Sequence, residues 1–270
     1  MNAFERVLCR IVDYTAQCEA VDRYFFHDER KDEESKDRGV FFIEGRDRDW
    51  LDVLPDHLAV RNKLNNYEGL DCRSNVDNLL ARNVKRLNGV LRSQDDFERQ
   101  LCSQMVRSGG CAAMCKEVAR WVNNRGDQRG NGRKVIYAPL DDRIGDKALV
   151  GILASARSLV DGLSIAAGRT LIVLFCFEST ASRLLGIAAW RRNRRRKKLA
   201  GQGIELLARP TRVDKRDLTD WIRRLEGLCR GLDPHTLKVA CNGRFPARKR
   251  WYYEELQGPL IEVLIAARIK

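Results

Sequence analysis

Histidine is scarce in this chain: His27, His57 and His235 are the only three, spread over 270 residues. Because histidine is the most common general base in enzymes, few such bases are available. The sequence also lacks the H-E-x-x-H pattern of zinc proteases and the G-x-S-x-G turn that carries a nucleophilic serine. With no established catalytic motif present, we expect a protein that is not an enzyme.

Long apolar runs are also missing. The longest, Leu171 to Phe177, has seven residues, whereas a membrane-spanning helix needs about 20. Segment 170–190 imitates a span followed by a positive flank, but polar residues interrupt it at 178–183. The N-terminal stretch "MNAFERVLCR" lacks the basic and apolar regions of a secretory signal. We therefore expect no membrane contact and a cytoplasmic location.

The nine cysteines are an odd number and mostly lie within apolar helical patterns. Reduced thiols are the simplest interpretation for a cytosolic chain. Cys111 and Cys115, in "CAAMC", are one helical turn apart, but a metal site would need two more ligands, and the histidines are scattered. We expect both cysteines to be buried helix residues, we expect no bound metal, and their role stays open.

The stretch "FFIEGRDRDW" at 41–50 begins as a phosphate-binding loop does, with an apolar strand that runs into Gly45. A working loop also needs a second glycine followed by Lys and Ser or Thr. This chain has "RDRDWL" instead, and Asp47 and Asp49 place negative charge where phosphates would sit. We expect no nucleotide and no other cofactor; an NTPase with an unusual loop is kept as an alternative.

Three acids lie where an α/β enzyme would use them. Glu178 ends an apolar strand, at the position where an NTPase holds Mg²⁺ or orients water. Asp141 and Asp142 follow another strand directly, at the edge where α/β sites form. Since no phosphate loop accompanies them, we interpret them as solvent-facing strand ends and loop residues.

Positive charge is abundant, with a formal net charge of +13 and a pI near 9.5. Such a balance permits contact with nucleic acid, anionic lipid or an acidic protein. Seven of the eight residues at 191–198 are cationic, and a block of like charges repels itself and is expected to be exposed. The alternative is a solvated connector between two strands. The candidate anion- or partner-binding residues are Arg191, Arg192, Arg194, Arg195, Arg196, Lys197 and Lys198.

Hydrophobic periodicity predicts an α/β chain with a helical end. Apolar runs at 39–45, 134–140 and 169–178 and the shorter 203–208 predict strands, and the helix between two of them, closed by Gly168, indicates a parallel crossover. The middle, 75–124, reads as helical, including 75–87, with Asp95 or Asp96 capping the helix at 95–106. The last sixty residues predict two helices, one capped by Asp214 or Asp217 and one that Pro259 starts or kinks.

The order of these elements resembles the inactive STAND domains of bacterial conflict systems. "DYTAQCEAVDRYF" is similar to the family's leading helix, and "GVFFIEG" to its first strand and decayed phosphate loop. "RTLIVLFCFE" with its cationic insert resembles a late strand and connector, and "RPTRVDKRDLTDWIRRL" resembles a proline-led helix with the pair Trp221 and Ile222. The resemblance implies a P-loop NTPase-like, mostly parallel sheet flanked by helices over 1–210, followed by a helical extension over 211–270.

The resemblance also implies a role without catalysis. On this hypothesis the chain is a signalling or adaptor protein of a prokaryotic conflict system that contacts separate protein effectors. The alternative is a basic regulator that binds nucleic acid through 191–198 and 244–250. A steep salt dependence would mark the second, because phosphate contacts release counterions. The oligomeric state is left open.

Overall fold

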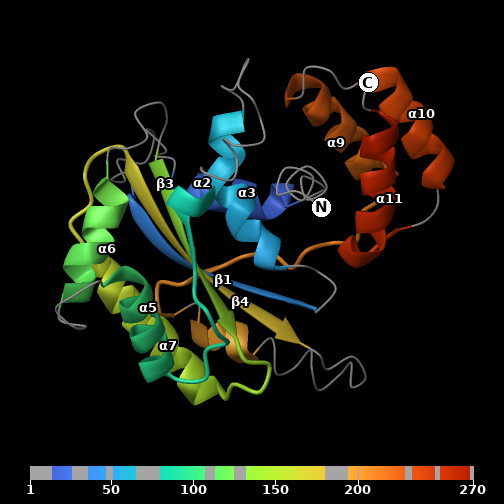
Figure 1. The fold of residues 1–270 in the computed structure, drawn as a ribbon. Helices are drawn as coiled ribbons and strands as arrows, with labels where there is room; N and C mark the ends of the chain where they lie inside the picture. Colours follow the sequence, from blue (N-terminus) through green and yellow to red (C-terminus); the bar gives the residue numbers. More distant parts are fainter. Residues whose placement is uncertain are drawn as a thin grey trace, which may run out of the picture.

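A five-stranded, wholly parallel sheet forms the centre of the molecule, with the strand order β2-β3-β4-β1-β5 (Figure 1). The structure is a computed structural model that describes residues 14–25, 36–46, 51–64, 80–106, 113–124, 132–179, 194–199, 201–228, 233–246 and 250–267. The P-loop NTPase-like α/β fold predicted from the sequence is confirmed. The strands are β1 (Arg38–Arg46), β2 (Val84–Arg86), β3 (Gly132–Leu140), β4 (Arg169–Ser179) and β5 (Glu205–Leu206).

The two long inner strands explain why the sequence pattern is apolar rather than alternating. β4 lies between β1 and β3 and pairs with each along nine residues. Residues 171–176 of β4 are at most 1% exposed, because both faces of a parallel sheet are covered by helices. A strand buried on both faces needs apolar residues at every position, as Leu171 to Phe177 provide.

Each face of the sheet has its own apolar core. On one face, α2 (Thr15–Phe25), the 3₁₀ turn η2 (Leu51–Val53) and α3 (Leu54–Leu64) pack over side chains such as Phe41 and Ile43. On the other, α5 (Gln94–Met105), α6 (Met114–Asn123) and α7 (Asp146–Asp161) pack over Phe42 and Phe175. Figure 1 shows these two layers on opposite sides of the strands.

The helical middle differs from the prediction in one place. Residues 80–83 are helical, but Val84–Arg86 form strand β2, which pairs with β3. A short pattern such as "NVKRL" does not distinguish a helix from a strand, and here the sheet edge decides. The helix that follows is capped by Ser93, whose hydroxyl accepts a hydrogen bond from the Asp96 amide, so neither Asp95 nor Asp96 is the cap.

Two further corrections concern α6 and α7. Cys115 is exposed, not buried, because α6 turns Val118 and Val122 inward and Cys115 lies away from that face; Cys111 lies outside the described residues. Helix α7 ends at Asp161 with Gly162 as its C-cap. Gly168 does not close the helix but stands just before β4 with φ of 75°, a left-handed conformation that glycine adopts without strain.

The C-terminal helices form a separate cluster, called here the helical unit. It contains α9 (Lys215–Leu228), α10 (Pro234–Arg244) and α11 (Tyr253–Ala266), and Figure 1 shows it beside the sheet and its helices rather than over them. Its core is distinct from the two cores of the sheet. An isolated antiparallel bridge between Val213 and Trp251 joins the segment before α9 to the segment before α11. Pro259 lies inside α11 and does not start it.

Local sequence explains where α9 begins and which face it buries. Asp214 and Asp217 both take part in the cap: the Asp214 carboxylate accepts from the Arg216 and Asp217 amides, and Asp217 accepts from the Asp214 amide. This reciprocal arrangement is a capping box. The face that follows carries Leu218, Trp221 and Ile222 into the core of the helical unit.

We predict that Trp221→Ala destabilises the helical unit by about 3–5 kcal/mol, the usual cost of truncating a buried Trp, because Trp221 is only 1% exposed. Denaturant unfolding followed by circular dichroism measures this cost. Val239→Ala is the control, since Val239 is 57% exposed and its truncation should change stability by at most about 0.5 kcal/mol. Equal unfolding midpoints for the two variants would contradict the packing described here.

Candidate functional site

The carboxyl edge of the sheet is the candidate functional site, because ligands of open α/β folds bind there. In the pairing register, Gly45 of β1 lies opposite Glu178 of β4, and Leu140 of β3 lies opposite Phe177. Asp141 follows Leu140 directly, so Gly45, Glu178 and Asp141 come from three adjacent strands at the same edge. The sequence predicted these positions correctly. The neighbours of these three residues determine whether a ligand can bind there.

The turn from β1 to α3 is where a phosphate loop would lie. A phosphate-binding turn presents several backbone N–H groups at the start of a helix. Here the start is apolar: Leu51 and Leu54 are fully buried, and the Leu51 carbonyl accepts from the Cys176 thiol, with 3.8 Å between the sulfur and the oxygen. Gly45 is an ordinary strand residue paired with Glu178. Residues 47–50, with Asp47 and Asp49, lie outside the described residues.

Asp141 is held by neighbouring protein groups. One carboxylate oxygen accepts from Arg92 Nε at 2.8 Å, and the other accepts from the Arg143 amide at 2.8 Å. The hydrogen bonds from the Arg143 amide and from the Arg92 side chain hold the pKa of Asp141 below its usual range. The Asp141 amide in turn donates to the Leu91 carbonyl. Asp141 therefore fastens the segment before α5 to the end of β3.

On the face of the sheet that η2 and α3 cover, an arginine links these elements to the sheet. Arg86 of β2 donates to the Asp52 carbonyl at 2.5 Å and to the Asp56 carboxylate at 2.6 Å, which anchors η2 and the start of α3. The same guanidinium lies 5.3 Å from the ring centre of Tyr137. Burial raises the pKa of Tyr137 and of the Cys176 thiol, and the nearby Glu178 raises both further. Both groups therefore stay uncharged at neutral pH, and Cys176 is not an activated nucleophile.

The basic run is only partly exposed. Residues 194–199 form a short helix at this edge, which places Arg195 and Leu199 on the same side, one turn apart. Leu199 is fully buried, and Arg195 lies 4.3 Å above the ring centre of Phe177 and 3.4 Å from an Asp146 carboxylate oxygen. The predicted exposure therefore holds for four of the five described cations of the block and is wrong for Arg195, because the helix turns this residue and Leu199 toward the apolar core.

The outer face of this helix keeps its charge in solvent. Arg194, Arg196, Lys197 and Lys198 are exposed. Lys198 Nζ is 3.6 Å from the Asp146 carboxylate, so Asp146 at the start of α7 holds both Arg195 and Lys198 against the sheet. Arg191 and Arg192 lie outside the described residues. Of the seven predicted candidates, Arg194, Arg196 and Lys197 are exposed cations on the outer face of the helix.

The excess positive charge is unevenly distributed along the sequence. Segment 191–198 has seven cations and no acid, and 211–270 has 13 Lys and Arg against eight Asp and Glu. The remaining 202 residues have 30 cations and 29 acids, so they are close to neutral. The protein therefore carries nearly all of its net charge on the helix at 194–199 with its flank and on the C-terminal sixty residues.

Neither a metal site nor a membrane helix is found among the residues that the structure describes. No group of three or more His, Cys, Asp or Glu side chains is placed to hold an ion in that part of the chain. In the same residues, no helix has both the length and the apolar content that crossing a bilayer requires.

Comparison with known proteins supplies no family. No protein-family model matches the chain, and neither does any curated protein. Among solved structures, the chain is similar to the ORC2 protein of Aeropyrum pernix, in ADPNP and ADP complexes, at 13% sequence identity and a TM-score of 0.42. The similar region covers 95% of this chain and 64% of the ORC2 chain. The fold class stated above rests on the strand order and pairing of this protein itself.

We predict that Arg195 and its neighbour Arg196 differ in their contribution to stability. Arg195→Ala removes the contact with Phe177 and the ion pair with Asp146, and cation–π contacts of this kind contribute about 0.5–2 kcal/mol. Arg196→Ala, at an exposed position, should change the free energy of unfolding by at most about 0.5 kcal/mol. Thermal and denaturant unfolding of both variants provide the measurement. An Arg196→Ala variant as destabilised as Arg195→Ala would show that the helix is oriented differently.

Proposed function

We propose that this protein is a non-catalytic signalling or adaptor protein of a prokaryotic conflict system, which acts through contacts with separate effector proteins. The observation that supports this most is the sequence after β1, where "RDRDWL" replaces the glycine, Lys and Ser or Thr of a phosphate loop and ends in the buried Leu51. The similarity of the element order to inactive STAND domains supplies the biological setting of the proposal.

The acids of the edge are consistent with this function. A catalytic Asp at the end of β3 would need a free carboxylate to hold Mg²⁺ or water. Instead, one carboxylate oxygen of Asp141 accepts a hydrogen bond from Arg92 and the other accepts one from the Arg143 amide. Arg195 covers Phe177 beside it and pairs with Asp146. The edge thus keeps the layout of a nucleotide site while its described side chains bind one another.

The outward cations of the helix at 194–199 offer a contact surface for a partner. Arg194, Arg196 and Lys197 are exposed on a helix whose other side is fixed by Leu199 and Arg195. Charges presented on a fixed helix steer an oppositely charged protein and raise its association rate more than its final affinity. An effector with an acidic surface is the partner that this surface fits.

We predict that the protein binds neither Mg-ATP nor Mg-GTP. Isothermal titration calorimetry with each nucleotide should give no saturable heat, because "RDRDWL" follows Gly45 in place of the second glycine, Lys and Ser or Thr of a phosphate loop. Micromolar binding that Arg46→Ala abolishes would contradict the proposal and favour an NTPase with an unusual loop.

We also predict that replacing Arg194, Arg196 and Lys197 with Ala slows capture of an effector protein with an acidic surface. The association rate should fall several-fold at low salt, and the difference should shrink as salt screens the charges. The matched control replaces Arg99, Lys116 and Arg120 of α5 and α6, which removes the same charge from another surface. An equal effect of the two triple variants would mean that net charge alone, and not this helix, governs capture.

A nucleic-acid-binding regulator is the second candidate function. The concentration of net charge on 191–198 and 211–270 favours it. The same triple variant distinguishes the candidates: a regulator would lose nanomolar affinity for a defined DNA or RNA with a steep dependence on salt, while protein capture would be unchanged. The adaptor should bind nucleic acid weakly and without sequence preference.

A further inference from the structure

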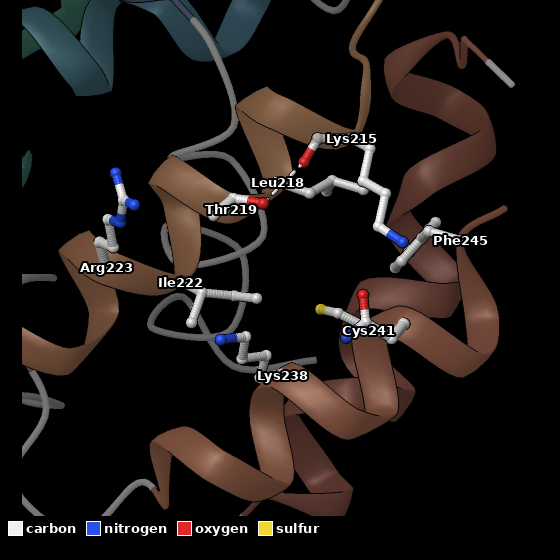
Figure 2. A pocket seen from close by; sticks show the side chains of 9 residues that line it. Lys215, Leu218, Thr219, Ile222, Arg223, Lys238, Cys241 and Phe245 are labelled. Carbon is white, nitrogen blue, oxygen red and sulfur yellow. Dashed lines mark hydrogen bonds between the residues drawn. The ribbon is translucent and has the colours of Figure 1, made fainter. Parts of the chain in front are cut away.

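The helical unit contains a groove between α9 and α10 that the function proposed above does not use. Its volume is about 260 Å³, and Figure 2 shows side chains of the two helices converging on it from both sides. It is lined by Lys215, Leu218, Thr219, Ile222, Arg223, Lys238, Cys241, Asn242 and Phe245. Neither α9 nor α10 is part of the candidate site at the carboxyl edge.

The floor of the groove is apolar and firmly held. Leu218, Ile222, Cys241 and Phe245 belong to the core of the helical unit and are between 2% and 7% exposed. The Phe245 ring packs edge-on against Trp251, with 5.3 Å between their centres, and Trp251 is bridged to Val213. Burial raises the pKa of the Cys241 thiol to about 12, so the floor carries no charge at neutral pH. An apolar side chain of a partner can therefore lie on this floor without removing water from a charged group of the protein.

The rim of the groove is cationic. Lys215 and Arg223 come from α9, Lys238 comes from α10, and the nine lining residues include no acid. Three described acids are adjacent in sequence to lining residues: Asp214 and Asp217 cap the start of α9, and Asp220 pairs with Arg223 at 3.4 Å. The groove therefore combines an uncharged floor with three positive charges.

The buried aromatic ring and the small volume of the groove favour one class of anionic partner over the others. Single-stranded nucleic acid needs exposed aromatic rings on which bases stack, and the aromatic ring of this groove, Phe245, is 2% exposed. Ligand pockets for small molecules usually enclose about 300–1,000 Å³, more than this groove offers. A volume of this size accommodates one or two apolar side chains of a segment that passes over it.

We propose that the groove between α9 and α10 docks an acidic, amphipathic segment of a protein partner. Carboxylates of the segment pair with Lys215, Lys238 and Arg223 while one apolar side chain enters the groove that these residues line. This inference rests on the proposed adaptor function and names the chemistry of its partner. An amphipathic helix in an apolar groove is a recurrent mode of peptide recognition.

The test uses the full-length protein and a fluorescein-labelled peptide of about 12 residues, roughly three helical turns, made of Glu with Leu at every third or fourth position. Fluorescence anisotropy measures its affinity. Changing Lys215 and Lys238 together to Glu should weaken binding at least about tenfold. The fold should survive, because Glu in the first turn of α9 is favoured by the helix dipole and Lys238 is exposed. Circular dichroism checks this point.

The matched control carries Lys116→Glu and Lys147→Glu, which changes the net charge equally on exposed positions of α6 and α7. It should bind the peptide as the unaltered protein does. A peptide of Glu alone should bind at least about tenfold more weakly, because it has nothing for the apolar floor. A Lys-Leu peptide should not bind.

Three results would overturn the inference: unchanged affinity of the Lys215 and Lys238 variant, an equal loss in the control variant, or equal binding of the Glu-only peptide. Displacement of the peptide by a short DNA duplex that binds more tightly to the same two lysines would assign the groove to nucleic acid instead. All titrations are made without nucleotide, so a finding of ATP binding would refute the adaptor function but leave the groove measurement intact. If the groove does not bind the peptide, the proposed role of Arg194, Arg196 and Lys197 in effector capture is not affected, because the triple variant tests that role separately.

Discussion

The parallel pairing of β1 with β4 is the constraint on which the arrangement of the sheet depends. The two strands run side by side along nine residues, from Arg38 opposite Leu171 to Arg46 opposite Ser179. Because apolar side chains emerge from both faces of this pair, two layers of helices are needed to exclude water. The same register brings the ends of β1, β3 and β4 to one edge, where Leu51 of η2 accepts a hydrogen bond from Cys176 of β4.

The sequence predicted the inner strands and the edge strand β5, but it did not predict the edge strand β2. Residues in β1, β4 and α7 repeat an apolar pattern long enough to identify the element without knowledge of its neighbours. Strand β2 has three residues, and only its pairing with β3 makes it a strand. Cys115 shows a similar limit, since a cysteine suits either side of a helix and the packing of Val118 and Val122 decides which side faces water.

The position of the candidate site could be predicted from the sequence, but the interactions of its acidic side chains could not. Strand ends can be located in a sequence, and Asp141 and Glu178 lie where that reasoning placed them. Whether such an acid is available depends on partners distant in the chain, as Arg92 is 49 residues from Asp141. Arg195 differs from Arg196 for the same reason: identical neighbours in sequence are separated by the turn of a short helix and by Phe177. The groove of the helical unit joins two helices, and no single segment carries its pattern.

The separation of β1 from its main partner along the chain affects how the protein is made. About 130 residues lie between Arg38 and Leu171, which pair at the start of the two strands. At a synthesis rate of about 5–20 residues per second, β1 leaves the ribosome roughly 7–26 seconds before β4 exists to receive it. Throughout that interval Phe41, Phe42 and Ile43 have no strand partner from β4. The helical unit, whose contacts lie within about 55 residues, can form as soon as it emerges, because local contacts are made fastest.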